Sequence, residues 1–386
     1  MSNEVKSGEA GRGCAKLSRR AFLGSLGALV AAGSSVWSVL STLAATQQGK
    51  DAAVSKAWPL EDFAKNVQSG GPPKDGIPPI DQPKYLPAAE AEKFLRAGDI
   101  VFGLEYRGVV KAYPQKILVW HEIVNEEAGN EKISLTYCPL TGSAVGFRGW
   151  SRADRTGLTF GTTGKLVSSN LLMYDRQTDS QWPQILGVAI AGPNKGVALE
   201  EIPLVWTTWG RWRGQYPQTL VLSTDTGFFR AYGSDLYGSY DRPGSYYDSG
   251  GPFFPVMASD RRFPAKDVVV GVKANSARLA LPKMAVARYK VINTSLGGVP
   301  LAALYDEELT AVRVFVRRAG ATVLTFRREG NTFVDDQTRA PWTAAGRCQG
   351  GRLLGTRLPV LPAYDVMWFA WYAFYPETRV WEAPGT

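Results

Sequence analysis

DRQTDSQW, at residues 175–182, returns further along the chain as DDQTRAPW, at residues 335–342. A second motif follows each copy: Trp209, Trp212, Tyr216, Pro217 and Thr219 recur at identical internal spacing as Trp368, Trp371, Tyr375, Pro376 and Thr378. Upstream, the pairs at 124–125 and 292–293 and the triplets at 158–160 and 324–326 also match. Matches that keep their order over such a long period predict two copies of a whole domain rather than a solenoid of short repeats.

Each copy is predicted to consist mainly of strands. The chain has 41 glycines and 24 prolines, and 11% of its residues are aromatic, which is typical of turn-rich β structure. Residues 116–124 and 133–138, with a polar turn at Gly129 between them, predict a β-hairpin. A short helix is expected at 208–216, because its three aromatic residues would share one face. We therefore expect an α+β, mainly β fold with an internal duplication of two similar strand-rich repeats.

These patterns divide the chain into five segments. The expected boundaries are 1–45 for a signal segment, 46–99 for an extended strap with a short helix near 88–96, 100–222 for repeat 1, 223–267 for a connecting segment rich in tyrosine and glycine, and 268–386 for repeat 2.

The first segment has the features of a twin-arginine export signal. SRRAFL at 18–23 contains two arginines, one spacer residue and two large apolar residues, and an apolar stretch with small residues follows it as far as Ala44. We expect the twin-arginine machinery to export the protein to the periplasmic or extracellular side of the cytoplasmic membrane. Cleavage after Ala44 is favoured over an uncleaved anchor, and no later stretch is apolar enough to span a bilayer.

The charge pattern argues against a nucleic-acid partner. The formal net charge is +9, but the basic residues form no run that could follow a phosphate backbone. Beyond the export machinery, the expected partner is a small molecule or a wall or surface ligand whose identity the sequence does not give.

Four motifs carry a resemblance to a known family. AYP at 112–114, WHEIVN at 120–125, YCPL at 137–140 and DRQT at 175–178 resemble the domain of unknown function 3179 family, over roughly residue 78 to the C-terminus. The family has no assigned function, so the resemblance implies no reaction. Its members commonly have a Cys-Pro-Leu-Cys pattern, and Thr141 stands here at the position of the second cysteine. The resemblance therefore argues against chemistry that needs a Cys-x-x-Cys pair.

The first copy alone combines an imidazole with a thiol. His121 is the only histidine, and Cys138 is one of two cysteines after the signal segment. They lie on the two arms of the predicted hairpin, where one register places them on the same face and the other on opposite faces. The aligned residues of the second copy are Tyr289 and Asp306. The hairpin of the first copy is therefore the predicted site.

Two hypotheses give these residues a chemical role. In the first, His121 activates Cys138 as a nucleophile or redox thiol, and Glu122 or Asn125 orients the imidazole. In the second, His121 and Cys138 bind a copper-like transition metal with help from Met173, Asp175 or Met257. No cofactor is assured by the sequence, and this metal is the one candidate.

A third hypothesis, which we favour, is that neither residue reacts. Cys138 and Cys348 would then form a disulfide, or Cys138 and His121 would simply be buried, and the protein would be a binding or structural module. A ligand cleft near the hairpin has four candidate wall residues, which are Asp175, Arg176, Gln177 and Tyr240. The motif at 175–178 is also typical of a turn before a buried tryptophan.

Overall fold

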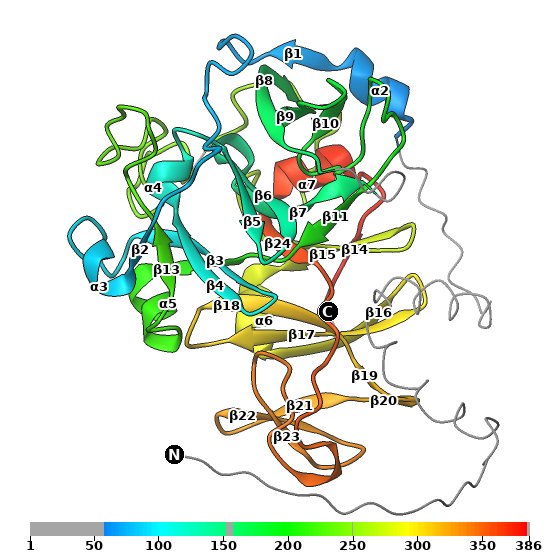
Figure 1. The fold of residues 1–386 in the computed structure, drawn as a ribbon. Helices are drawn as coiled ribbons and strands as arrows, with labels where there is room; N and C mark the ends of the chain where they lie inside the picture. The colour runs from blue at the N-terminus through cyan, green and yellow to red at the C-terminus, as the bar shows by residue number, and fades with distance from the viewer. Residues whose placement is uncertain (1–57, 152–156, 249, 384–386) are drawn as a thin grey trace, which may run out of the picture. The chain divides into compact units, whose positions relative to one another are not determined.

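β-Strands dominate the secondary structure. The computed structural model describes residues 58–151, 157–248 and 250–383 (Figure 1). In this part of the chain the strands form small, mostly antiparallel sheets, and all helices are short. The predicted α+β, mainly β class is confirmed. The arginine motif at 18–23 lies outside the described residues.

Residues 100–222, called the first half below, contain the elements nearest the predicted site. In chain order these are β3 (Ile100–Tyr106), β4 (Val109–Pro114), α4 (Gln115–Leu118), β5 (Ile123–Ala128), β6 (Glu131–Cys138), η1 (Pro139–Thr141), β7 (Ser143–Ser151), β8 (Phe160–Val167), β9 (Asn170–Asp175), β10 (Gln181–Pro183), β11 (Leu199–Ile202), β12 (Val205–Thr208), α5 (Trp209–Gln215) and β13 (Leu220–Leu222).

Residues 268–383, called the second half, follow a connecting segment at 223–267 that has no helix or strand in its described part. The second half contains β14 (Val268–Ala274), β15 (Ala277–Pro282), α6 (Lys283–Tyr289), β16 (Val291–Leu296), β17 (Val299–Asp306), β18 (Ala311–Val316), β19 (Arg318–Ala319), β20 (Thr322–Val323), β21 (Phe326–Glu329), β22 (Thr332–Asp335), β23 (Pro341–Trp342), η2 (Gly351–Leu353), β24 (Ala363–Met367), α7 (Trp368–Phe374) and β25 (Arg379–Val380).

The strap before Ile100 is mostly extended and is attached to the first half. It contains α2 (Leu60–Lys65), β1 (Val67–Ser69), β2 (Tyr85–Pro87) and α3 (Ala88–Ala91). β1 pairs with β8, and β2 pairs with β13. The helix expected near 88–96 begins where predicted and ends at Ala91.

Corresponding sheets occur in the two halves. The order β12-β3-β4-β13 in the first half corresponds to β24-β14-β15-β25 in the second. In the same way β7-β6-β5 corresponds to β18-β17-β16, and β8-β9-β10 corresponds to β21-β22-β23. In each half the last strand of the first sheet pairs in parallel, β13 with β4 and β25 with β15.

The repeated tryptophans make the same contacts in both halves. The indole nitrogen of Trp212 donates to the hydroxyl of Thr219 (3.0 Å), and that of Trp371 donates to Thr378 (2.9 Å). Each indole lies directly on a strand glycine, Gly103 in β3 and Gly271 in β14. A side chain at either glycine would overlap the ring, so glycine is required by this close approach.

Two of the hydrophobic clusters combine side chains of both halves. The largest cluster of buried side chains includes Cys138, Phe160 and Trp182 of the first half together with Trp368 and Trp371 of α7. In Figure 1, α7 (red) accordingly lies beside the green strands β7 to β10. A second cluster joins the α5 tryptophans to Leu309 and Ala311 of the second half. Other clusters do not cross between the halves: one lies around β3 to β6 in the first half, and another around β17 to β23 in the second.

The predicted hairpin is present, but its first arm is shorter than expected. β5 and β6 pair around Gly129, with Ile123 opposite Thr136. The predicted strand at 116–124 is wrong over its first residues, because residues 115–118 form α4 and the chain turns before Ile123. Ile117, Leu118 and Val119 are all buried, and a short apolar run of this kind fits a helical turn as well as a strand.

The helix expected at 208–216 is confirmed as α5. Trp209 and Trp212 are buried, and Thr208 occupies the N-cap position without a side-chain capping bond. Among the helices in the described residues, none has the length and apolar character needed to cross a bilayer.

Candidate functional site

His121 is fully buried after α4 and connects the strap to the connecting segment. Its Nδ1 donates to the carbonyl of Pro78 (2.7 Å), so in the neutral ring Nε2 accepts from the hydroxyl of Tyr232 (2.7 Å). Burial lowers the pKa of the imidazole; the bond to Pro78 opposes this, and the charge of Arg230 adds to it. His121 is therefore neutral at pH 7, and both of its nitrogens are occupied.

Cys138 ends β6 and lies inside the largest core cluster. Its sulfur accepts a hydrogen bond from the backbone N–H of Leu171 (3.3 Å) and donates to the carbonyl of Ser169 (3.8 Å). Burial raises the pKa of the thiol to about 11, and the nearby carboxylate of Glu122 adds to this rise. Cys138 is therefore a protonated thiol at neutral pH, which is the weaker nucleophile.

The two predicted residues thus have separate environments. The register of β5 and β6 places His121 opposite Cys138 beyond the end of the ladder, but the imidazole bonds to the strap and the connecting segment, whereas the thiol bonds to residues 169 and 171. Asn125 does not contact the imidazole through any of its hydrogen bonds. Its amide holds the backbone of Phe160 through two bonds, of 2.8 and 3.0 Å, and also bonds to Asp81.

The alternative of a disulfide is wrong for this structure. Cys138 and Cys348 are both free and buried. They belong to different core clusters, Cys138 with the α7 side chains and Cys348 with the side chains around β21 to β23.

Glu122, which the sequence offered only as an orienting residue, has the most unusual environment in the hairpin. Its backbone has a left-handed φ of 58°, which is uncommon for a residue other than glycine. Its side chain is 7% exposed, and burial raises the pKa of the carboxyl to about 8. Backbone strain and a shifted pKa in one residue are features that concentrate at functional sites.

Tyrosines of the connecting segment cover this end of the hairpin. Tyr240 stacks on Tyr247 with ring centroids 3.7 Å apart, and its hydroxyl is 3.0 Å from that of Tyr137 in β6. Asp235 accepts hydrogen bonds from Tyr247 (2.9 Å) and from Gln115 (2.7 Å). The predicted wall residue Tyr240 is therefore part of a packed polar network, and its hydroxyl bonds within the protein.

The motif at 175–178 forms a turn. The carboxylate of Asp175 accepts from the backbone and hydroxyl of Thr178 and from the indole of Trp182 (2.9 Å). Asp335 makes the same bonds to Thr338 and Trp342 in the second half.

The other two residues of this motif contact neighbouring segments. Arg176 pairs with Asp81 of the strap (2.6 Å). Gln177 bonds to the backbone N–H (3.0 Å) and the hydroxyl (3.2 Å) of Thr159. All three candidates in the motif thus make contacts within the protein.

The described residues contain no cluster of ligands that would support the metal hypothesis. Within the described residues, no group of three or more histidine, cysteine, aspartate or glutamate side chains could hold a metal ion. Met173 and Cys138 share the largest core cluster, whereas the imidazole of His121 is bonded to Pro78 and Tyr232.

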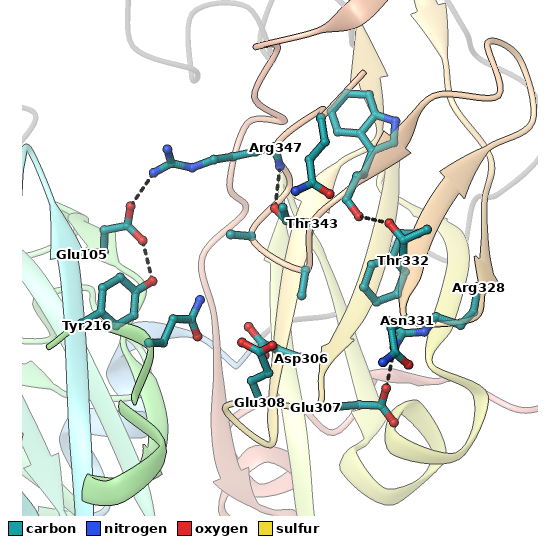
Figure 2. A pocket seen from close by; sticks show the side chains of 16 residues that line it. Glu105, Tyr216, Asp306, Glu307, Glu308, Arg328, Asn331, Thr332, Thr343 and Arg347 are labelled. Atoms are coloured by element: carbon teal, nitrogen blue, oxygen red, sulfur yellow. Dashed lines mark hydrogen bonds and ion pairs between the residues drawn. The ribbon is translucent and has the colours of Figure 1, made fainter. Parts of the chain in front are cut away.

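An open cleft lies elsewhere, between the two halves. This inter-half cleft has a volume of about 520 Å³ and is lined by Glu105, Gln215 and Tyr216 of the first half and by residues within 306–308, 328–333 and 342–349 of the second. Figure 2 shows Glu105 and Tyr216 on one wall, facing Thr343, Thr332 and Asn331 on the other. Its lining combines carboxylates, guanidinium groups, amides and hydroxyls.

The charges of the inter-half cleft are largely paired. Arg347 reaches across from the second half to Glu105 (3.0 Å), as Figure 2 shows, and Tyr216 donates to the same carboxylate (2.8 Å). Glu307 pairs with Arg328 (2.6 Å) and with Lys290 (2.6 Å).

The two other carboxylates of the cleft differ in their surroundings. Asp306 is 3.5 Å from the guanidinium of Arg313, which bonds in turn to the Tyr216 hydroxyl (3.3 Å). Glu308 is exposed. The cleft is therefore lined by four carboxylates and two guanidinium groups, and Glu308 is the carboxylate with no ion pair among the described residues.

Sequence reasoning did not find this cleft. Its residues come from separated segments of both halves and share no motif. Of the residues with unusual environments, the sequence indicated only Glu122, which stands beside His121 in the motif at 120–125. Nothing in the sequence indicated the backbone conformation of Glu122 or the pKa of its carboxyl.

Comparison with known proteins gives a family and no relative of known activity. No curated protein and no solved structure matches the chain. The model of the family described as "Protein of unknown function (DUF3179)" matches residues 74–378, which is more than half of the sequence. The match agrees with the resemblance expected from the four motifs, and the chain therefore belongs to the DUF3179 family.

Proposed function

We propose that the protein is an exported binding protein whose ligand occupies the inter-half cleft. The observation that carries this proposal is the cleft itself, which is open, polar and formed by side chains from both halves. A volume of about 520 Å³ lies within the range of small-molecule sites. The buried, protonated thiol of Cys138 and the fully bonded imidazole of His121 support binding over catalysis.

A ligand screen with matched variants tests the proposal. Thermal unfolding would be followed in the presence of defined neutral, anionic and cationic polar compounds, because a ligand that binds only the folded state raises the melting temperature. We expect at least one compound to stabilise the wild type and to lose most of its effect in Glu308→Gln or Asn331→Ala. Glu377→Gln, at an exposed carboxylate outside the cleft, is the control. Binding that survives both cleft variants, or no binding at all, would refute the proposal.

A thiol-dependent reaction is the second candidate, and one observation favours it. Glu122 lies close enough to Cys138 to influence the pKa of its thiol, and it combines a buried carboxyl with a strained backbone, features that concentrate at functional sites. Its effect raises the pKa of the thiol, so the reaction would require a change that favours the thiolate. It would also require the tyrosines of the connecting segment to move aside.

Alkylation with iodoacetamide at pH 7.5, with mass spectrometry to identify the modified cysteine, separates the two candidates. We expect Cys138 to react at least about a hundredfold more slowly in the folded protein than in urea, because its thiol is buried and protonated. Rapid alkylation of Cys138 in the native protein would favour the thiol enzyme.

Export itself is testable through the arginine pair. Replacing both Arg19 and Arg20 with lysine should retain the protein in the cytoplasm, since the export machinery reads the two arginines. Fractionation of cells that express the wild type and the variant gives the result. Lys16→Arg is a matched control outside the pair, and equal export of all three chains would contradict the proposed route.

A further inference from the structure

A second hollow adjoins the inter-half cleft. It has a volume of about 620 Å³, and both cavities are lined by Gln215 and Tyr216 at the end of α5. Its other lining residues come from the start of β4 and from the connection between α5 and β13. The two cavities therefore share one wall and can accommodate parts of the same ligand.

The lining of this second hollow is mainly apolar. Val109, Val110, Pro217 and Leu220 contribute to it, and Leu220 is 41% exposed, so that it presents apolar surface to solvent. We call the part of the cavity lined by these four residues the apolar hollow. The one ionic group at its edge, Lys111, is buried and paired with Glu126, and so adds no free charge. Apolar surface next to a polar cleft is typical of a binding site.

An unsatisfied acceptor lies in the wall that the two cavities share. The side-chain oxygen of Gln215 is buried and accepts no hydrogen bond in the described part of the chain. Buried polar atoms are nearly always bonded, and one without a partner calls for an explanation. A hydroxyl group of a ligand that passes between the cavities would supply the missing donor.

The paired charges of the cleft indicate which chemical type of head group the ligand has. The carboxylates of Glu105 and Glu307 and the guanidinium groups of Arg347 and Arg328 neutralise one another. An anionic head group would have to break these pairs and would be repelled by the exposed carboxylate of Glu308, whereas hydroxyl groups can donate to the carboxylates, Glu308 included, and accept from the arginines without breaking a pair.

We propose that the ligand is an amphiphile with an uncharged, polyhydroxylated head group in the inter-half cleft and an alkyl or similar apolar chain in the apolar hollow. This inference rests on the proposed binding function, and it adds the chemical class of the ligand. The hydroxyl nearest the chain bonds to Gln215, and the chain covers Leu220.

Alkyl glucosides of increasing chain length test the inference, all below the concentrations at which they form micelles. Calorimetry would compare glucose with its hexyl, octyl and decyl glucosides on the full protein. We expect the affinity to rise about threefold to tenfold for each two added methylenes, since each buried methylene favours binding. Leu220→Asn should remove most of this dependence on chain length, and Gln215→Leu should weaken all the glucosides together. Leu236→Asn, at an exposed leucine outside both cavities, is the control and should match the wild type.

The outcomes separate this inference from the proposed function. Affinities independent of chain length, an unchanged dependence in Leu220→Asn, or tighter binding of an alkyl sulfate or alkyl trimethylammonium of equal length would overturn the inference. If polar compounds still bind and Asn331→Ala still weakens them, the binding function stands. If no compound in either series responds to a cleft variant, both proposals are wrong.

Discussion

Burial changes the pKa of three side chains at the end of the hairpin. Glu122 and Cys138 both have a raised pKa, and burial is the main cause in each case. His121 has a lowered pKa for the same reason, because burial disfavours the charged form of either type of group. At neutral pH, therefore, the imidazole and the thiol of this region are uncharged, and the carboxyl is largely so.

The Glu122 carboxyl should make stability depend on pH. Its pKa rises from the ordinary 4.5 to about 8 on folding, so between these values the folded chain holds a proton that the unfolded chain has lost. The stabilisation is complete below about pH 4.5 and is lost as the pH rises to about 8, with a slope of up to about 1.4 kcal/mol per pH unit. Urea unfolding between pH 5 and 8 measures this slope.

Glu122→Gln is the matched control for that measurement. Glutamine keeps the size and polarity of the side chain but does not titrate. The stability of the variant should therefore not fall in this way as the pH rises. The difference between the two proteins removes the contribution of His121, which acts in the opposite direction below its unperturbed pKa. Parallel stability curves for the two proteins would show that the carboxyl is not held protonated.

Among the elements, the pairing of a helix tryptophan with a strand glycine occurs in both halves. The indoles of Trp212 and Trp371 each cover a glycine and donate to a threonine hydroxyl. We interpret the corresponding sheets and these corresponding contacts as the result of an internal duplication. That interpretation implies that equivalent substitutions have equivalent effects.

Substituting the two glycines tests this implication. Gly103→Ala and Gly271→Ala should each destabilise the protein by about 1–3 kcal/mol or more, because the added methyl group overlaps the indole ring. Gly214→Ala, in α5 with open space around it, should be neutral or slightly stabilising. Chemical denaturation gives the free energies. A large cost at one strand glycine and none at the other would contradict the structural equivalence.

For the whole molecule, the two clusters that combine side chains of both halves make the halves depend on each other. α7 of the second half completes the core of the first-half strands, and residues of β18 and the loop before it complete the core around α5. The inter-half cleft exists only because the halves meet in this way.

The isolated second half should therefore fail to fold. Residues 268–386 expressed alone would expose the apolar side chains of α7, which are buried in the whole chain. We expect weak near-UV circular dichroism and binding of a hydrophobic dye, with a single cooperative transition for residues 46–386. A cooperative thermal transition of the isolated half would show that it is an independent domain.

The sequence by itself determined the mainly β class, the position of helix α5, the hairpin around Gly129 and the family. These depend on local patterns, such as the aromatic spacing of 209–216 and the motif at 120–125, which neighbouring residues suffice to produce. The same local rules gave the wrong start for the hairpin, where a short, fully buried apolar run fits a strand and a helical turn equally well.

Only the tertiary structure decided the properties of the candidate sites. The separation of His121 from Cys138, the desolvation of Glu122 and the free state of both cysteines depend on which distant segments cover them. The inter-half cleft likewise joins Glu105 to Arg347 across most of the chain. Burial and charge pairing are set by contacts between residues far apart in sequence, and no local pattern encodes them.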